Sequence, residues 1–434
     1  MTFVCSNIGV NAENHLTFAG QDTLRLAEEY GTPLYLMDED RIRRNCRLYL
    51  DAFQASFRPG SLPHYAAKAA AFKAICRVVG EEGMGIDVCS TGEIATVQAA
   101  GVDMSRVMFP SNGKSDGDIR YAMDRGVGCF VVDNTEELLA LEAEAEKRGI
   151  TQKALLRLTP GIDPHTYAAV NTGMVDSKFG VAIETGQAEQ FLRLALQQKH
   201  IELLGYHCHV GSQVFGEDVF ERAAAVMLEF IADMAKKTGY LAGVLDLGGG
   251  YGVPYVAEDP AIDIPEKIAS VAAAVKETCA RLDIPEPQIM MEPGRSIVAD
   301  AGMTLYRVLA VKRITGYKSY VTIDGGMTDD PRYALYRSRY TVLPAGRMGE
   351  KADFRTTLAG RCCESGDLIQ ENILLPDSVC RGDVIAVCTT GAYNYSMASN
   401  YNRFGRPPGV MLRAGDSYVA VRRETPEDLL RLDN

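Results

Sequence analysis

One lysine of this 434-residue chain, Lys68, stands in a run of small and apolar residues, the segment 64–70 (HYAAKAA). A short run of this kind that leads into a helical pattern predicts a buried parallel strand and its C-terminal end. Burial disfavours a charged ammonium, and the neutral amine is the form that makes imines with carbonyl compounds. Lys68 is therefore a candidate nucleophile. The alternative is a lysine that reaches water or pairs with a carboxylate.

The most informative carboxylate is Glu292, in the segment 292–295 (EPGR). A carboxylate beside a pyridine nitrogen keeps that nitrogen protonated, which makes the ring a strong electron sink. The alternative is a structural ion pair between Glu292 and Arg295 or another cation.

Three consecutive glycines, Gly248–Gly250, expose backbone N–H groups that can approach a phosphate closely. Ser212 offers a hydroxyl donor to such a group, and Arg295 offers a charged, forked donor. The alternative is a tight turn between a strand and a helix, since glycine is the usual turn residue.

The segment 207–209 (HCH) ends with His209, and its two histidines share one face of a strand. A zinc site needs further ligands, and the sequence shows no ligand cluster around this pair, so we predict no metal. The alternative to a functional His209 is an ordinary core histidine.

Composition excludes several classes of protein. The net charge of −12 argues against nucleic-acid and membrane partners, whose binding proteins usually carry a basic surface. The eleven cysteines are scattered and form no CxxC pair, which predicts a reducing compartment. No signal peptide is recognisable, and no apolar run reaches the roughly 18 residues of a membrane span. We therefore expect a cytoplasmic protein.

Short apolar runs alternate with helical patterns from about residue 39 onwards. Eight runs are expected as strands: 62–68, 85–89, 106–110, 128–132, 153–158, 202–209, 244–247 and 288–292. Repeated βα units of this number predict a closed (β/α)8 TIM-like barrel over residues 38–304. The alternative is an open doubly wound sheet, but no GxGxxG follows the first strand.

The periodicity changes after residue 304, where strand-like runs are joined by turns. This pattern predicts a second, mainly antiparallel β domain formed by residues 1–37 and 305–434. The run 34–36 either joins that domain or leads from it into the barrel. The predicted fold class is therefore α/β + β. Function in such a barrel gathers at the C-terminal ends of the strands, where the residues singled out above fall.

Four motifs in chain order resemble those of the fold-type III pyridoxal-phosphate decarboxylases, which have the alanine-racemase-like barrel. They are Tyr-Ala-x-Lys at 65–68, His-x-Gly-Ser at 209–212, Gly-Gly-Gly at 248–250 and Glu-Pro-Gly-Arg at 292–295. The resemblance implies that Lys68 holds pyridoxal 5'-phosphate covalently, His209 stacks on its ring and Glu292 meets its pyridine nitrogen. The implied cofactor-binding residues are Lys68, His209, Ser212, Gly249, Gly250, Glu292, Gly294, Arg295 and Tyr393.

The β domain is similar to that of one member group, the diaminopimelate decarboxylases. The matching segments are 332–336 (RYALY), 363–367 (CESGD), 391–393 (GAY) and 399–402 (SNYN). The implied substrate-binding residues are Arg295, Arg332, Tyr336, Glu364 and Tyr393. The resemblance also implies a homodimer in which the Cys363–Glu364 segment reaches the active site of the partner subunit.

The implied reaction converts meso-2,6-diaminopimelate to L-lysine and CO2, the last step of lysine biosynthesis. Its implied catalytic residues are Lys68, His209 and Cys363, with Cys363 or Lys68 returning a proton to carbon. The alternative for Cys363 is an inert, packed cysteine. The alternative substrates are ornithine, lysine, arginine or a carboxylated polyamine such as carboxynorspermidine. Each of these carries one carboxylate, so none needs the arginine that Arg332 offers to a second carboxylate.

Two positions depart from the motifs of this family. Ala70 stands where asparagine is common, and the segment 328–331 (TDDP) before Arg332 varies the commoner pattern. Neither change removes a catalytic group, and only the second lies next to a residue that is implied to bind substrate. Glu292 distinguishes the chain from alanine racemases, which place an arginine at the pyridine nitrogen. Non-catalytic cofactor carriers of the single-barrel kind lack a β domain.

Overall fold

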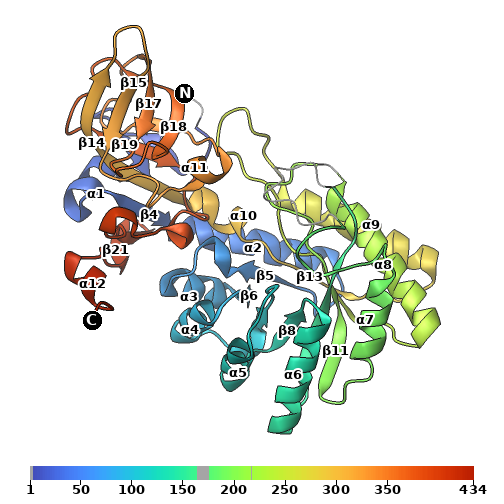
Figure 1. Cartoon of the computed structure of the whole chain (residues 1–434). Coiled ribbons are helices and arrows are strands. Elements are labelled where there is room, and N and C mark those ends of the chain that lie inside the picture. The colour runs from blue at the N-terminus through green and yellow to red at the C-terminus, as the bar shows by residue number, and fades with distance from the viewer. Residues whose placement is uncertain (1–2, 164–174, 217) are drawn as a thin grey trace. The chain divides into compact units, whose positions relative to one another are not determined.

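The computed structural model describes residues 3–163, 175–216 and 218–434 (Figure 1). The chain divides into two compact units. The first, the sheet unit, comprises Met1–Arg43, Val253–Ala261 and Ile297–Asn434, and the second, the barrel unit, comprises Arg44–Gly252 and Ile262–Ser296.

The barrel unit contains a closed barrel of eight parallel strands, as the alternating pattern predicted. The strands are β5 (Leu62–Ala66), β6 (Gly85–Asp87), β7 (Val107–Phe109), β8 (Cys129–Val132), β9 (Gln152–Thr159), β11 (Ile201–His207), β12 (Val244–Asp246) and β13 (Gln288–Met291). Neighbours pair in this order, and the pairing of β13 with β5 closes the ring. The two-residue strand β10 (Val181–Ala182) pairs only with β9 in the described structure.

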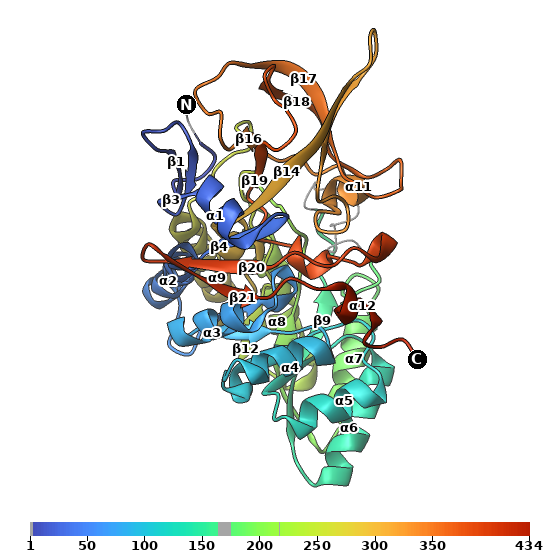
Figure 2. The ribbon, with the colours of Figure 1, turned by 90° about the vertical axis from the view of Figure 1, so that its left-hand side faces the viewer.

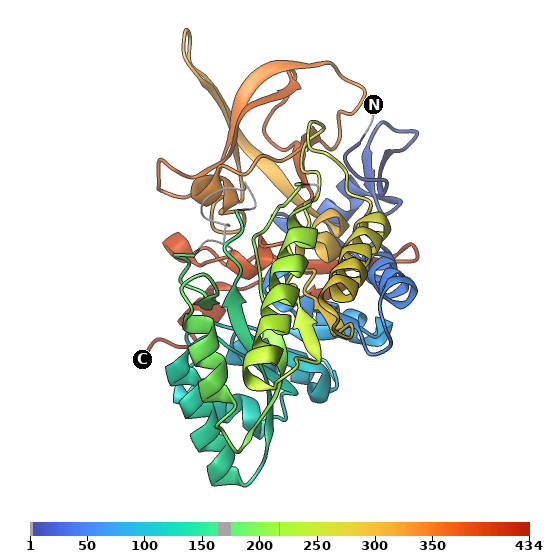
Figure 3. The same ribbon diagram turned by 90° about the vertical axis from the view of Figure 1, so that its right-hand side faces the viewer.

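Helices alternate with the strands and cover the outside of the barrel (Figure 1). They are α2 (Glu39–Ser56), α3 (Lys73–Glu82), α4 (Thr91–Ala99), α5 (Asp116–Asp124), α6 (Thr135–Arg148), α7 (Gln187–Ala195), α8 (Val219–Thr238) and α9 (Ile264–Leu282). Side chains of Ser90, Ser115, Asn134 and Asp263 cap the N-termini of α4, α5, α6 and α9. Such caps satisfy backbone N–H groups that have no partner inside the helix. Successive helices from α3 to α7 pack on one another, as do α8 and α9 (Figure 3).

Two layers of side chains fill the inside of the barrel. The lower layer is apolar and contains Met108, Cys129, Val131, Leu155 and Val244. Residues two positions apart on a strand point to the same face, so Arg157 and Asp246 stand above Leu155 and Val244. The resulting upper layer, at the C-terminal ends of the strands, is ionisable and buried, and it consists of Asp87, Arg157, His207, Asp246 and Glu292.

The sheet unit is mainly antiparallel, which confirms the predicted second architecture (Figure 2). Its strands are β1 (Ile8–Val10), β2 (Leu16–Phe18), β3 (Gln21–Asp22), β4 (Leu34–Asp38), β14 (Gly302–Arg313), β15 (Ser319–Ile323), β16 (Val342–Pro344), β17 (Ala352–Ala359), β18 (Leu368–Pro376), β19 (Val384–Cys388), β20 (Gly409–Arg413) and β21 (Asp416–Val421). Strand β4 pairs with β14 and β20, so the run expected at 34–36 joins this sheet.

The remaining elements of the described chain are short. They are α1 (Thr23–Tyr30), α10 (Arg295–Val298), α11 (Arg332–Tyr336), α12 (Pro426–Leu430) and the 3-10 turns η1 (Ala67–Ala69), η2 (Met104–Arg106), η4 (Ala299–Ala301), η5 (Tyr395–Met397) and η6 (Tyr401–Arg403). Among the residues described, none of the helices has the length and apolar character needed to span a membrane.

Candidate active site

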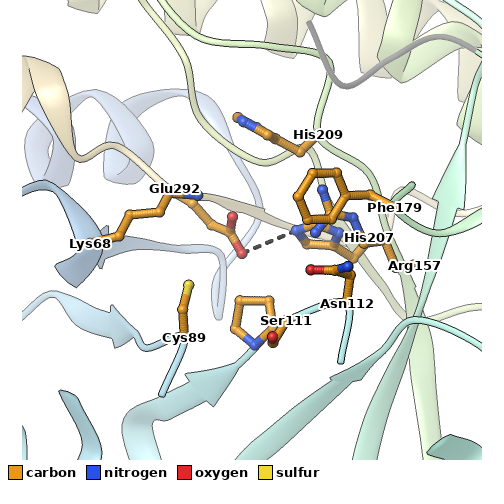
Figure 4. Close-up of a pocket in the computed structure, with 10 residues that line it drawn as sticks. Lys68, Cys89, Ser111, Asn112, Arg157, Phe179, His207, His209 and Glu292 are labelled. Atoms are coloured by element: carbon orange, nitrogen blue, oxygen red, sulfur yellow. Dashed lines mark hydrogen bonds and ion pairs between the residues drawn. The ribbon is translucent and has the colours of Figure 1, made fainter. Parts of the chain in front are cut away.

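A cavity of about 280 Å³ lies at the C-terminal end of the barrel strands. Its walls are formed by Lys68, Cys89, Pro110, Ser111, Asn112, Arg157, Phe179, His207, His209 and Glu292 (Figure 4). The cavity therefore brings together three residues that the sequence singled out in separate motifs, Lys68, His209 and Glu292.

Lys68 lies in the turn η1, directly after strand β5. The backbone N–H of Ala66 donates to the carbonyl of Pro293 at 3.1 Å, which fixes the end of β5 beside the segment that carries Glu292. The hydroxyl of Tyr65 donates to the carbonyl of Ala70 at 2.9 Å and closes the turn. The lysine side chain is half-buried, less enclosed than the sequence suggested, and it borders the cavity.

Glu292 follows strand β13 and is buried in the upper layer. Its Oε1 lies 3.1 Å from Nε2 of His207. Burial alone would raise the pKa of Glu292, but His207 and Lys68 favour the carboxylate and hold that pKa well below its usual range. Glu292 is therefore an anion on the wall of the cavity.

His209 also borders the cavity, two residues beyond the end of β11. The backbone N–H of Gly249 donates to its Nδ1 at 3.3 Å, which leaves Nε2 as the protonated nitrogen of a neutral ring. Burial and the positive charges of Lys68 and Arg157 keep the pKa of His209 well below its ordinary value. A neutral, flat ring of this kind can stack on another ring.

Ser212 and Arg295 meet at the same end of the barrel. Nη2 of Arg295 donates to Oγ of Ser212 at 3.0 Å, and the guanidinium is buried. The triple glycine is required by backbone geometry. Gly248 and Gly250 have positive φ angles of 66° and 128°, and a Cβ on Gly249 would lie 1.9 Å from the carbonyl oxygen of Glu292.

These groups fit pyridoxal phosphate. The hydroxyl of Ser212, the guanidinium of Arg295 and the glycine-rich backbone are donors that a phosphate accepts. The carboxylate of Glu292 suits a protonated pyridine nitrogen, and the amine of Lys68 suits an aldehyde. Gly294 allows the close approach of two segments, since a Cβ there would lie 3.0 Å from Ala66.

Part of this site was not apparent from the sequence motifs. Arg157 lines the cavity, and its guanidinium carbon lies 4.3 Å from the ring centroid of Phe179. The signal was present, because a charged residue inside the apolar strand β9 needs a buried partner or a ligand. His207 lies in a cluster with Asp246 and Glu292, a grouping that the sequence motifs did not reveal.

The sheet unit places Arg332 in an aromatic setting. Its guanidinium carbon lies 5.9 Å, 5.6 Å and 5.4 Å from the ring centroids of Tyr255, Tyr336 and Tyr393. Nη2 of Arg332 donates to Ser338 at 3.3 Å, whereas its buried Nε has no hydrogen-bond partner among the described residues. The structure therefore places two predicted substrate residues, Tyr336 and Tyr393, beside a third, the buried Arg332. Tyr255 also borders Arg332, which the sequence did not reveal.

Cys363 and Glu364 lie on the loop between β17 and β18, with both side chains exposed. The backbone N–H of Cys363 donates to Oδ1 of Asn402 at 2.8 Å. The buried Asp367 anchors the loop by accepting hydrogen bonds from the N–H groups of Met327 and Cys362 at 2.6 Å and 2.7 Å. Cys363 thus lies exposed on a loop that hydrogen bonds hold in place, and it is not a packed core cysteine.

Comparison with known proteins gives consistent matches along the chain. A family model described as the pyridoxal binding domain of pyridoxal-dependent decarboxylases matches residues 39–299. A diaminopimelate decarboxylase of Bacillus subtilis (strain 168) is 42% identical over 423 residues, which are 98% of this chain and 96% of that protein.

Solved structures also match over nearly the whole chain. The diaminopimelate decarboxylase of M. jannaschii in complex with L-lysine has a TM-score of 0.91 and 30% identity, covering 100% of this chain and 99% of the other. A lysine/ornithine decarboxylase of Vibrio vulnificus in complex with cadaverine has a TM-score of 0.78 and 27% identity. The match covers 93% of this chain and 100% of the other.

Proposed function

The chain belongs to the pyridoxal-dependent decarboxylases and, among them, to the diaminopimelate decarboxylases, and on this basis we propose that it converts meso-2,6-diaminopimelate to L-lysine and CO2. The observation that carries the proposal is the cavity that Lys68 and Glu292 share, an amine that suits the aldehyde and a carboxylate that suits the pyridine nitrogen of pyridoxal phosphate.

The barrel residues hold the cofactor in this proposal. Lys68 attaches it through its amine, His209 stacks on its ring, and Arg295 with Ser212 binds its phosphate beside Gly249 and Gly250. Gly294 and Tyr393 complete the proposed cofactor contacts. Bound pyridoxal phosphate supplies the electron sink for the electron pair that remains when CO2 leaves. Glu292 favours this chemistry because its negative charge stabilises a protonated pyridine nitrogen.

The sheet-unit residues hold the substrate in this proposal. Arg332 binds the carboxylate that is not lost, since Nε of its buried guanidinium has no hydrogen-bond partner within the described part of the chain and a charge-assisted pair is strong away from water. Arg295, Tyr336 and Tyr393 add further substrate contacts. Glu364 meets the distal ammonium. Cys363 or Lys68 would then return a proton to the carbon that lost CO2, which completes the carbon skeleton of L-lysine.

A decarboxylase for ornithine, lysine or arginine is the second candidate, supported by the match to the lysine/ornithine decarboxylase. Such substrates carry only the carboxylate that is lost. A buried Arg332 without a substrate carboxylate would remain a costly, incompletely paired cation. This cost favours a dicarboxylate substrate.

We further propose a cytoplasmic homodimer whose active sites are shared between subunits. The exposed Cys363–Glu364 loop supports this idea, because a proton donor and a carboxylate that face solvent in one subunit are available to another. A homodimer with two-fold symmetry then contains two equivalent shared sites. The eleven unpaired cysteines suit a reducing compartment.

Measurement of CO2 release from four substrates tests the proposed activity. The cofactor-loaded protein should turn over meso-diaminopimelate with a kcat/KM at least about 100-fold above those for ornithine, lysine and arginine, because a site built around a polar group rejects substrates that lack its partner. Comparable values for all four substrates, or a preference for ornithine, would assign the second candidate function.

A further inference from the structure

Asp133 is a buried acid near the cavity to which the proposed reaction assigns no role. It directly follows strand β8, and the next residue, Asn134, caps the N-terminus of helix α6 with its side chain. Asp133 is only 4% exposed. A buried carboxylate needs hydrogen bonds or a neighbouring cation, so the partners of Asp133 indicate what this residue does.

The pairing of β8 with β9 places Asp133 beside Arg157. Val132 and Leu156 are register partners on these strands, and Asp133 and Arg157 are the residues that follow them. Oδ1 of Asp133 lies 4.0 Å from Nε of Arg157, and the two side chains are 6% and 9% exposed. The acid and the cation therefore form an ion pair that is largely shielded from water.

The same carboxylate holds a chain segment that packs on Arg157. Oδ1 of Asp133 accepts a hydrogen bond from the backbone N–H of Gly180 at 2.9 Å. The carbonyl of the preceding residue, Phe179, accepts one from the hydroxyl of Thr159 at 2.8 Å, and β10 pairs with the end of β9. A Cβ on Gly180 would lie 3.0 Å from Cγ and from the carbonyl oxygen of Arg157, so the segment lies directly against this arginine.

Arg157 and Phe179 line the cavity together, whereas Asp133 does not line it (Figure 4). The guanidinium carbon of Arg157 lies 4.3 Å from the centroid of the Phe179 ring, within the range of a cation–π contact. Arg157 is therefore held by two contacts, an aromatic ring at its guanidinium carbon and a carboxylate at its Nε. Asp133 is the residue that joins both elements of this wall.

We propose that Asp133 is a positioning residue that holds Arg157 and Phe179 in place on the wall of the cavity. Asp133 acts through these two residues and does not touch the ligand. A cation that is already fixed attracts an anionic ligand without the entropic cost of ordering a long side chain during binding. Pyridoxal phosphate is such a ligand. This consequence rests on the proposed function, whereas the contacts of Asp133 are a property of the protein alone.

The alternative is a local role in the turn between β8 and α6. The backbone N–H of Asp133 donates to Oε2 of Glu137 at 3.4 Å, a contact that does not need the Asp133 side chain. A purely local role would make the effect of an Asp133 substitution on ligand binding independent of Arg157. The proposed role makes the two effects overlap, because Asp133 acts through Arg157.

Hydrogen–deuterium exchange of the cofactor-free protein is the first test. Asp133→Ala removes the acceptor for the N–H of Gly180, and exchange in the peptide that contains Gly180 should become at least about tenfold faster. Asp133→Asn keeps a carbonyl oxygen at this position and should stay within about threefold of the native rate. Unchanged exchange in Asp133→Ala, or equally fast exchange in both variants, would contradict the proposal.

Pyridoxal phosphate binding to a pair of variants and their combination is the second test. Asp133→Ala and Arg157→Met should each raise the dissociation constant at least about tenfold, by analogy with residues that orient the groups around a bound ligand. The double variant should bind at most about threefold more weakly than Arg157→Met alone. Losses that multiply to about a hundredfold would show that Asp133 acts independently of Arg157 and would overturn the proposal.

Matched controls keep the second test interpretable. Asp124→Asn removes an exposed acid that pairs with Arg148 at 2.7 Å and should leave the dissociation constant within about twofold of the native value. Circular dichroism checks that each variant folds. If Asp133→Ala fails to fold, Asp133→Asn takes its place in the binding measurements, since it removes the charge beside Arg157 and keeps the acceptor for Gly180. If the native protein does not bind pyridoxal phosphate, the proposed function is wrong, and the exchange rates still decide whether Asp133 holds the segment.

Discussion

Nζ of Lys114 lies 2.7 Å from Oε1 of Glu137, and the two side chains are 0% and 3% exposed. Lys114 also donates to the carbonyl oxygens of Ser111 at 3.1 Å and Val131 at 2.9 Å. All three ammonium protons are therefore used inside the protein. Because Ser111 lines the cavity, this ion pair joins one wall of the site to strand β8 and helix α6.

Removal of both members of this pair should cost less than the sum of the two separate removals. Lys114→Met or Glu137→Leu alone leaves a buried charge and should lower the free energy of unfolding by about 3–5 kcal/mol. The double substitution should lose less than the sum of the two single losses, with a coupling of at least about 2 kcal/mol. Urea unfolding of all four proteins measures the coupling, and additive losses would show that the pair contributes no specific interaction.

Lys68→Ala should abolish covalent attachment of the cofactor and nearly all turnover. The native protein should be yellow, and borohydride should bleach its absorbance band and fix the cofactor to the protein. Mass spectrometry of peptides then identifies the modified residue. Lys73→Ala, an exposed lysine at the start of α3, is the matched control and should retain colour and activity. Attachment at Lys73 or Lys178 would contradict the assignment.

Arg332→Ala should reduce kcat/KM for meso-diaminopimelate by about 2–5 kcal/mol of transition-state binding, since truncation of a buried charge pair costs this much. The slow reactions with lysine and ornithine should change little, because they lack the distal carboxylate. Arg339→Ala removes an exposed arginine that pairs with Glu258 and should change neither value. An equal loss on all substrates would mean that Arg332 supports the fold or the cofactor.

Two inactive variants should restore activity when their subunits exchange. Lys68→Ala and Cys363→Ala disable different parts of a shared site, so a mixed dimer should contain one intact site. Random mixing gives half mixed dimers, and recovery should therefore approach about a quarter of native activity. Subunit exchange is verified with differently tagged proteins. If exchange occurs and activity stays absent, each subunit contains its own complete site.

Asp330 should make the stability of the sheet unit depend on pH. Burial raises the pKa of this carboxyl to about 7, although Arg332 opposes the effect. Below about pH 4 the residue is protonated in both the folded and the unfolded chain, and its contribution to stability is fully present. As the pH rises toward 7, the unfolded chain releases its proton first, so this contribution is lost.

Asp330→Asn should therefore stabilise the protein relative to the native chain as the pH rises from about 4 to 7. The gain should reach on the order of 2–4 kcal/mol above pH 7, and thermal unfolding at pH 5 and pH 8 measures it. Asp353→Asn, at an exposed position of β17, is the control and should show no such trend. A difference that is the same at both pH values would contradict the buried, protonated state of Asp330.

Local sequence signals predicted the barrel well because each βα unit is marked at both ends. Apolar runs of strand length alternate with helices whose ends carry residues such as Ser90 and Gly149, so the order of elements could be derived without long-range information. Lys68, His209 and Glu292 could be placed at one end of the barrel for the same reason, since parallel strands share their direction.

The contacts between side chains could not be derived in this way. The His207–Asp246–Glu292 cluster depends on which residues become register partners on neighbouring strands, and the sequence gives no direct signal of register. The Lys114–Glu137 pair joins the loop after β7 to helix α6, a contact that only the tertiary packing defines. Val253–Ala261 belongs to the sheet unit although it lies between two barrel elements in the chain. Such an assignment depends on tertiary packing, which outweighs local patterns.

The two layers of side chains inside the barrel have different roles: the lower layer stabilises the barrel, and the upper layer contains the ionisable groups. Met108, Leu155 and their neighbours fill the lower layer with apolar volume, which stabilises the barrel. The upper layer contains five ionisable residues where apolar side chains would be more stabilising. Substitutions meant to raise the thermal stability of the enzyme should therefore be made in the lower layer. Apolar substitutions in the upper layer would also raise stability, but they would remove groups that the reaction needs.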